Sequence, residues 1–309
     1  MKRCLITYDL IEGEGEYSAR GLKLLDRNLA SLAPLSYTAE EQRAEALERV
    51  GKMSIQGLQL KLSAKLKVKA GAFEVVDRNG RFILKPPSLD FPELPENEDL
   101  TMRLGAIVGI EVPLHGLVRA RDGSLTYFIK RFDRDGRTRV PLEDFAQLSG
   151  ASRETKYESS MEKVASVVDQ FCIFPAIERV KLFDRTIFSF LTGNEDMHLK
   201  NFSLITRRGR IALAPAYDLL NSTIALKNPK EEMALPIGGK RSGLTRKDLF
   251  EYFAAERLQI NKRVLAERIE RFRAAVPIWD ELIAASFLSP EKKAAYAAVL
   301  AERKDRLQF

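Results

Sequence analysis

The sequence predicts an α+β fold with two lobes, in which a small strand-rich N-lobe precedes a larger helical C-lobe. Short apolar or alternating runs separated by turn residues fill residues 53–140, as is typical of strands. Helical periodicity dominates residues 141–309. Residues 1–52 are expected to form an N-terminal cap followed by a helix. We therefore expect three parts, with a ligand-binding cleft where the two lobes meet.

Local signals fix the individual elements. Thr38 and Glu41 have the spacing of a capping box, which predicts a helix start. Asn79-Gly80 predicts a hairpin turn between the strands Phe73–Val76 and Arg81–Lys85. The other expected strands are Leu58–Ala64, Leu114–Arg119, Thr126–Phe132, Asn201–Ile205 and Arg210–Ala214, and the other expected helices are Asn97–Val108, Lys163–Cys172, Ala176–Leu191, Arg246–Ala255, Asn261–Ala275 and Ser289–Arg306.

The composition excludes several classes of protein. Hydrophobic residues make up 45% and charged residues 30% of the 309 residues, the balance of a globular protein. No apolar run approaches the roughly 18 residues of a membrane span, and the N-terminus lacks a signal-peptide core, so we expect a cytoplasmic protein without membrane contact. Cys4 and Cys172 are distant in sequence and argue against a zinc or disulfide framework. The net charge of +7 favours anionic partners.

The segment Gly193–Asn201 carries the first candidate catalytic residues. Asp196 is followed five residues later by Asn201, which is the spacing of the D-x-x-x-x-N pattern of protein kinases. Phosphoryl transfer needs a carboxylate to accept the hydroxyl proton and oxygen ligands for Mg²⁺, and these two residues supply both. Because the pattern alone is common, a polar loop that caps a helix is the alternative.

Two further residues follow the same order along the chain. Asp218, in the segment Pro215–Asn221, comes after a short expected hairpin, where a kinase has its second Mg²⁺-binding aspartate. Lys85 ends an apolar strand, and Glu98 lies on the next helix, the arrangement of the kinase lysine that contacts nucleotide phosphates. The alternatives are a turn-forming aspartate and a strand-end lysine that extends into solvent.

The loop before the first strand pair is a weaker signal. Residues 53–61 contain Ser54 and Gly57 and stand where a phosphate-covering loop belongs. The segment has one glycine, so it matches neither G-x-G-x-x-G nor a Walker A motif. Chance matches at these separate positions would be independent, and their common order therefore favours a kinase.

Six segments together match one family. They are Ser54–Lys61, Phe128–Arg134, Glu143–Phe145, Lys156–Glu158, Gly193–Ser203 and Pro215–Asn221. In these segments the chain resembles the HipA-type serine/threonine kinases, which are toxins of bacterial toxin–antitoxin operons. It is short beside a full-length HipA kinase, which has an extra N-terminal subdomain. In this it resembles HipT of three-component systems, where a separate small protein supplies that subdomain.

The resemblance implies a role for each candidate residue. Asp196 would be the catalytic base, with His198 and Lys200 supporting the loop or the γ-phosphate. Asn201 and Asp218 would hold Mg²⁺. The implied ATP-binding residues are Ser54, Gly57, Lys85, Glu98, Lys130, Phe132 and Asp133.

Two of these implied positions have a more specific meaning. Lys130–Phe132 would be the hinge that recognises adenine through its backbone. Ser54 would be an autophosphorylation site whose modification inactivates the enzyme, because a phosphate there would repel the phosphates of ATP. Gln56 stands where some HipT proteins carry a second serine, which argues against regulation at two sites.

The resemblance also implies partners and a substrate. These are a small HipS-like antitoxin, a HipB-like DNA-binding antitoxin through which DNA is contacted indirectly, and an aminoacyl-tRNA synthetase whose phosphorylation would block translation. HipT points to the tryptophanyl enzyme and HipA to the glutamyl enzyme. Two alternatives remain at this point. One is a kinase-fold enzyme for small molecules, and the other is a non-catalytic module tethered to DNA, although the sequence has no helix-turn-helix signature.

Overall fold

The computed structural model describes residues 2–49, 60–136, 138–152, 154–226, 229 and 231–309. The chain divides into two compact units. Unit 1 contains Met1–Asp99, Pro113–Arg137 and Ala285–Phe287. Unit 2 contains Leu100–Val112, Thr138–Ala284 and Leu288–Phe309. Among the described residues, no helix is both long enough and apolar enough to span a membrane.

Unit 1 is built on a five-stranded antiparallel sheet. Its strand order is β4-β3-β5-β7-β6. The strands are β3 (Leu62–Lys67), β4 (Ala72–Val75), β5 (Phe82–Lys85), β6 (His115–Arg119) and β7 (Leu125–Lys130), with the 3₁₀ turn η1 (Val68–Ala70) between β3 and β4.

The predicted hairpin at Asn79-Gly80 is wrong in its pairing. β4 and β5 both pair with β3, which lies between them, and do not pair with each other. The connection passes across β3, because the backbone N–H of Val76 donates to Ser63 and that of Arg81 donates to Ala64. A Cβ atom at Gly80 would lie 1.9 Å from Ser63 Oγ. The glycine therefore allows a close crossing over a strand.

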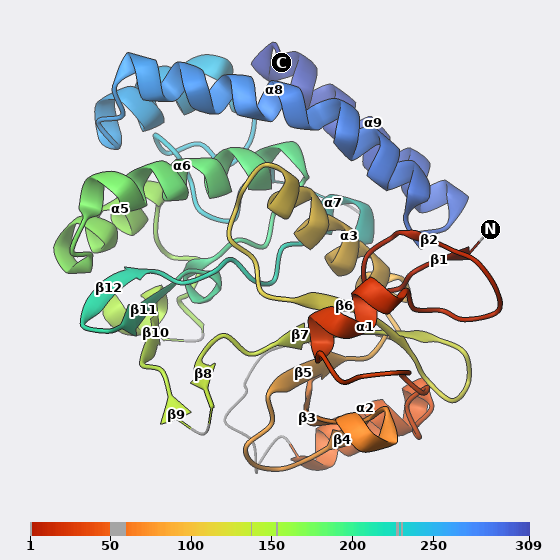
Figure 1. The fold of residues 1–309 in the computed structure, drawn as a ribbon. Coiled ribbons are helices and arrows are strands. Elements are labelled where there is room, and N and C mark those ends of the chain that lie inside the picture. Colours follow the sequence, from red (N-terminus) through yellow and green to blue (C-terminus); the bar gives the residue numbers. More distant parts are fainter. Residues whose placement is uncertain (1, 50–59, 137, 153, 227–228, 230) are drawn as a thin grey trace. The chain divides into compact units, whose positions relative to one another are not determined.

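Apolar side chains from the sheet and the N-terminal segment form the core of unit 1. The N-terminal elements are β1 (Lys2–Arg3), β2 (Leu10–Ile11), α1 (Ala19–Leu25) and α2 (Ala39–Arg49), and α2 contacts β3 (Figure 1). The capping box predicted at the start of α2 is confirmed, since Thr38 Oγ1 accepts from the N–H of Glu41 at 3.1 Å and Glu41 Oε2 accepts from the N–H of Thr38 at 2.7 Å. The core residues include Ile6, Leu22, Leu25, Leu62, Phe73, Phe82, Leu84 and Phe128.

Unit 2 is mainly helical and is centred on α6 (Pro175–Leu191). Every residue of α6 from Leu182 to Leu191 is buried. The strands of unit 2 are β9 (Thr138–Arg139) and the antiparallel β10 (Leu142–Asp144), β11 (Ser203–Arg207) and β12 (Arg210–Leu213). Its other helices are α4 (Phe145–Leu148), α5 (Met161–Phe171), η2 (Leu199–Asn201), α7 (Ser222–Ala225), the π-helix η3 (Lys247–Arg257), α8 (Lys262–Ala285), α9 (Pro290–Leu307) and most of α3 (Leu94–Ile107), which begins in unit 1. Helix α6 contacts α5, α9 and β12, and α8 and α9 lie on its side opposite to the strands (Figure 1). The short strand β8 (Arg134–Asp135) belongs to unit 1.

Helix α8 extends ten residues beyond its predicted end at Ala275. It continues through Pro277, which in an isolated helix removes a hydrogen bond and favours a break. Packing overrides this preference, because the ring of Trp279 is fully buried and its Nε1 donates to the carbonyl oxygen of Leu104 at 2.9 Å. The aromatic ring thus anchors the second half of α8 against α3.

Candidate active site

The loop that carries Asp196 begins at a glycine that no other residue replaces easily. Gly193 lies just after α6 with φ of 67°, in the left-handed region. A Cβ atom there would lie 2.8 Å from Thr223 Oγ1 and 2.9 Å from Asn221 Oδ1 and Val299 Cγ1. The chain can therefore turn sharply out of the buried helix only without a side chain at this position.

Hydrogen bonds fix the loop to the segment that follows Asp218. Thr223 Oγ1 donates to the carbonyl oxygen of Gly193 at 3.0 Å and lies 2.6 Å from Glu195 Oε1. Ser222 Oγ accepts from the N–H of Glu195 at 2.6 Å. These contacts hold the backbone on the N-terminal side of Asp196 in one conformation.

We predict that Gly193→Ala lowers the free energy of unfolding by about 2–3 kcal/mol, since a left-handed alanine costs about 1 kcal/mol or more and its Cβ meets three atoms. Urea denaturation measures the change. Gly209→Ala is a matched control, because Gly209 has φ of 73° but open space around its Cβ position. A Gly193→Ala variant no less stable than the control would contradict this explanation of the turn.

Asp196 lies at the centre of a hydrogen-bonded loop. Its carboxylate accepts from the hydroxyl of Tyr157, and its N–H donates to Asn194 Oδ1 at 3.2 Å. Its carbonyl oxygen accepts from the N–H of His198 at 2.8 Å and from Asn201 Nδ2 at 2.9 Å. The amide nitrogen of Asn201 makes this bond, so its amide oxygen is the atom of the side chain that could coordinate a cation.

His198 connects the loop to a segment some forty residues earlier in the chain. Its Nε2 lies 2.6 Å from Lys156 Nζ, and its ring packs edge-on against Tyr157, with 4.9 Å between the ring centroids. Burial lowers the pKa of His198, and the ammonium group of Lys156 lowers it further, against the opposing charges of Asp196 and Asp218. A lowered pKa favours the neutral imidazole, and a neutral imidazole can accept a hydrogen bond from Lys156 through Nε2.

The lowered pKa of His198 makes a testable prediction about stability. Between that pKa and the ordinary value of 6.5, the unfolded chain binds a proton that the folded chain does not. The free energy of unfolding is therefore expected to fall as the pH drops below about 6.5, and to fall less in His198→Gln, which keeps an acceptor for Lys156 but does not titrate. Urea denaturation at several pH values between 5 and 8 measures both. Equal losses in the two proteins would refute the prediction.

Lys200 contacts different groups from His198. Its ammonium group lies 3.9 Å from the carboxylate of Asp144, and its carbonyl oxygen accepts from the hydroxyl of Tyr217 at 2.9 Å. Tyr217 is also hydrogen-bonded to Ser203. These contacts link the end of the loop to the start of β11 and to the segment that carries Asp218.

Asp218 adopts an unusual backbone conformation. Its φ is 54°, a left-handed value that is uncommon for a non-glycine residue and is concentrated at functional sites. The neighbouring backbone is fixed by the bond from the N–H of Ala216 to the carbonyl oxygen of Glu111 at 2.7 Å. The negative charge of Asp218 opposes the lowering of the pKa of His198. Carboxylate and amide oxygens such as those of Asp218 and Asn201 are the hard ligands that Mg²⁺ prefers.

In unit 1, Lys85 and Glu98 form a buried ion pair. Lys85 Nζ lies 2.6 Å from Glu98 Oε1, and the two side chains are 3% and 1% exposed. The ammonium group also lies 5.6 Å from the centroid of the Tyr127 ring. These values exclude the alternative of a strand-end lysine extended into solvent. Next to the pair, His115 Nδ1 is 2.9 Å from the carboxylate of Asp99.

Three other candidate ATP-binding residues, Lys130, Phe132 and Asp133, lie at the end of β7 or just after it. The N–H of Lys130 already donates to the carbonyl oxygen of Leu114 at 2.8 Å. Asp133 accepts from Arg131 at 2.9 and 2.7 Å and is also bonded to Arg134. Although burial opposes its ionisation, these two guanidinium groups lower the pKa of Asp133. Phe132 lies between these residues, whereas Ser54 and Gly57 lie outside the described residues.

Sequence patterns assigned no role to several residues that contact the loop Gly193–Asn201. Ser222 and Thr223 hold its backbone, and Lys156 and Tyr157 contact His198 and Asp196. Residues 156–158 were among the segments that match the family, and this was the available signal. Their contact with the loop was invisible because it depends on how distant segments pack.

The chain is similar to known proteins over most of its length. Residues 53–279 match the family of HipA-like C-terminal domains. A putative kinase of Haemophilus influenzae is 32% identical over 74% of this chain. Alignments with this relative and with two putative kinases of Sinorhizobium fredii span 70%, 62% and 51% of those proteins.

Two solved structures share the fold. The HipA chain in a complex of HipA, HipB and operator DNA from Shewanella oneidensis superposes with a TM-score of 0.68 and 22% identity, over 91% of this chain and 74% of that one. The Helicobacter pylori proinflammatory kinase CtkA gives a TM-score of 0.53 and 17% identity, over 73% of this chain and 86% of that one. The expected α+β kinase-like fold is thereby confirmed.

Proposed function

The chain belongs to the family of HipA-like C-terminal domains, and we propose that it is an ATP-dependent serine/threonine protein kinase that acts as a toxin of a bacterial toxin–antitoxin system. The observation that supports this most directly is the loop at Asp196, in which the side-chain amide of Asn201 donates to the backbone carbonyl of Asp196. A base and a metal ligand at this spacing are what phosphoryl transfer requires.

In the proposed reaction, Asp196 accepts the proton of a seryl hydroxyl as its oxygen attacks the γ-phosphorus of ATP. A new P–O bond forms, the bond to the β–γ bridging oxygen breaks, and ADP leaves. Asn201 and Asp218 hold Mg²⁺, which when bound neutralises charge on the phosphates. The hydroxyl of Tyr157 donates to Asp196, so an incoming serine competes with it for that carboxylate.

The residues of unit 1 are proposed to bind ATP. Lys85 contacts the ATP phosphates, and Glu98 fixes its ammonium group through the 2.6 Å ion pair. Lys130 and Phe132 border the adenine, and Asp133 holds the backbone beyond them through Arg131 and Arg134. We further propose Ser54 as the autophosphorylation site and Gly57 as part of the phosphate-covering loop.

The substrate and partners are proposed from the resemblance to HipT. The substrate is a serine of an aminoacyl-tRNA synthetase, the tryptophanyl enzyme first, and its phosphorylation would block translation in the cytoplasm. The partners are a small HipS-like antitoxin and a HipB-like DNA-binding antitoxin. That the similar HipA chain of Shewanella oneidensis occurs in a complex with HipB and operator DNA supports such a setting.

Transfer of phosphate to protein tests this function. Purified chain, Mg²⁺ and γ-labelled ATP are incubated with tryptophanyl-tRNA synthetase, with the glutamyl enzyme or with a cell lysate. We expect label on the tryptophanyl enzyme, and on Ser54 of the chain itself, with the latter absent in Ser54→Ala. Label confined to small metabolites would support the alternative of a small-molecule kinase. No ATP binding, combined with DNA binding by the chain alone, would support the non-catalytic alternative.

A further inference from the structure

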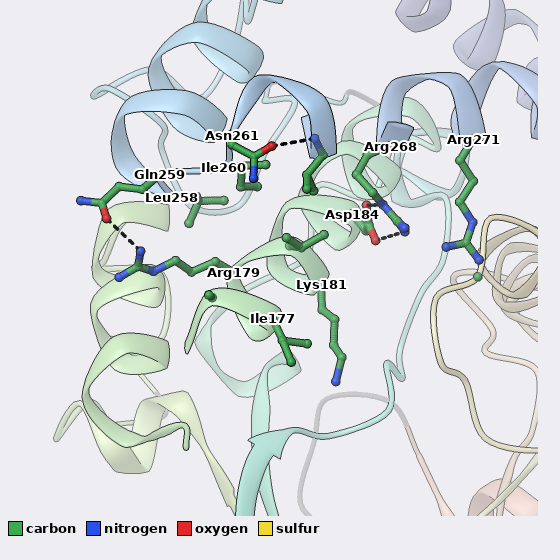
Figure 2. Close-up of a pocket in the computed structure, with 14 residues that line it drawn as sticks. Ile177, Arg179, Lys181, Asp184, Leu258, Gln259, Ile260, Asn261, Arg268 and Arg271 are labelled. Carbon is green, nitrogen blue, oxygen red and sulfur yellow. Dashed lines mark hydrogen bonds and ion pairs between the residues drawn. The ribbon is translucent and has the colours of Figure 1, made fainter. Parts of the chain in front are cut away.

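Unit 2 has a groove separate from the catalytic loop (Figure 2). It is formed by the first turns of α6, the connection Leu258–Asn261 and the first turns of α8, and its volume is about 520 Å³. Neither the loop Gly193–Asn201 nor Asp218 lines it, and nothing in the proposed kinase reaction uses it. Among the residues that the structure describes, the groove therefore shares none with the proposed kinase site.

The groove is rich in positive charge. Among the described lining residues, four are cationic, Arg179, Lys181, Arg268 and Arg271, and one is anionic, Asp184. At one end the cations have carboxylates of their own, since Arg179 Nε donates to Asp169 at 2.6 Å and Lys181 Nζ donates to Glu178 at 2.8 Å. These two side chains are therefore largely neutralised.

At the other end, one carboxylate is shared among several guanidinium groups. Arg268 forms two hydrogen bonds with Asp184, one of them 2.9 Å long, and Arg271 lies beside them (Figure 2). Burial raises the pKa of Asp184, whereas the positive charges of Arg268, Arg271 and the buried Arg185 oppose this rise. Within the part of the chain that the structure describes, Arg271 forms no hydrogen bond or ion pair of its own, and it packs against Gly109, where a Cβ atom would lie 1.5 Å from Nη2. A second carboxylate, in addition to that of Asp184, would therefore neutralise more of the positive charge of Arg268 and Arg271.

Apolar side chains continue along the same groove. Leu258 and Ile260 are buried in its wall, and Ile177 lines it while remaining 56% exposed. Phe174 and Ile173, which precede Ile177 by about one helical turn, are 52% and 46% exposed. Ile173 and Phe174 do not line the groove themselves, but three large exposed apolar residues within five positions of the chain are typical of a surface that another molecule covers.

We propose that this groove docks an acidic segment of a partner polypeptide in which aliphatic side chains alternate with aspartates or glutamates. An acidic side chain of the segment pairs with Arg271, and its aliphatic side chains cover Phe174 and Ile177. Nucleic acid offers phosphates for the cations but no aliphatic groups for these two residues. The net charge of +7 attracts an acidic partner at long range.

The test measures binding of a fluorescein-labelled peptide with leucines and isoleucines among glutamates and aspartates. We expect saturable binding by the wild-type chain that weakens with added salt, and much weaker binding of a matched peptide with glutamine and asparagine as its polar residues. Arg271→Ala is expected to weaken binding about tenfold and Ile177→Ser several-fold. Arg263→Ala is the matched control, because Arg263 is a cation of the same helix whose side chain is 90% exposed and does not line the groove.

Three outcomes would overturn the proposal. The first is equal affinity of the acidic and the amide peptide, and the second is equal loss of affinity in Arg271→Ala and Arg263→Ala. The third is binding of duplex DNA that depends on Arg271 while the peptide does not bind, which would make the groove a nucleic-acid surface. Because the assay uses no ATP, these outcomes are independent of whether the chain is a kinase.

Discussion

Asp196→Asn is expected to lower kcat for phosphoryl transfer by about 10²–10⁴-fold, the contribution typical of a positioned general base. Asparagine has the shape of aspartate but cannot accept the proton of the attacking hydroxyl. The substitution keeps the backbone carbonyl that orients Asn201 and an oxygen that can accept from Tyr157. Binding of ATP and Mg²⁺ is therefore expected to change little, and the loss is expected to fall on kcat.

Steady-state kinetics measures kcat, and nucleotide titration measures the affinity for ATP. Asp280→Asn is a matched control, since it removes one exposed carboxylate on α8 and is expected to leave kcat and ATP affinity unchanged. A stable Asp196→Asn protein with wild-type kcat would remove Asp196 from the chemistry. A variant that loses ATP binding as strongly as it loses turnover would instead assign the residue to metal or nucleotide binding.

Lys85→Met is expected to have the second-largest effect. The substitution leaves Glu98, whose side chain is 1% exposed, as a buried carboxylate without its cation. Breaking a buried ion pair in this way destabilises a protein by roughly 3–5 kcal/mol. Phosphoryl transfer is also expected to be lost, because the substitution removes the cation that is proposed to contact the ATP phosphates.

A double substitution separates folding from chemistry in this case. Lys85→Met with Glu98→Leu removes both charges, and apolar replacement of a buried pair is often neutral for stability. We therefore expect denaturation close to wild type but no recovery of transfer. Lys67→Met is the control, because Lys67 and Glu74 form an ion pair whose side chains are 53% and 50% exposed, worth about 0–1 kcal/mol. Restored transfer in the double variant would contradict the role given to Lys85.

The sequence predicted the features that depend on residues close together in the chain. The capping box of Thr38 and Glu41 and the buried helix Ala176–Leu191 follow from local spacing, and the structure contains both. The lysine–glutamate contact of Lys85 and Glu98 was expected from the order of a strand and the following helix. Local patterns were sufficient because each of these features is stabilised within a short segment or between consecutive elements.

The features that the sequence did not predict depend on distant segments. A glycine after asparagine predicted a hairpin, but β3 lies between the two strands, since Gly80 allows the chain to cross over Ser63. Helix α8 continues beyond Pro277 because Trp279 is anchored to α3. Tyr157 reaches Asp196 from another loop, and periodicity carries no information about such a contact.

The most direct test of the central claim is the mass of the intact chain after incubation with ATP and Mg²⁺. We predict that the wild-type chain gains the mass of one phosphoryl group, located on Ser54, and that Asp196→Asn and a sample with the metal chelated gain none. Wild-type chain that binds no ATP and gains no mass, or Asp196→Asn chain that is phosphorylated at the wild-type rate, would contradict the assignment of Gly193–Asn201 as a catalytic loop.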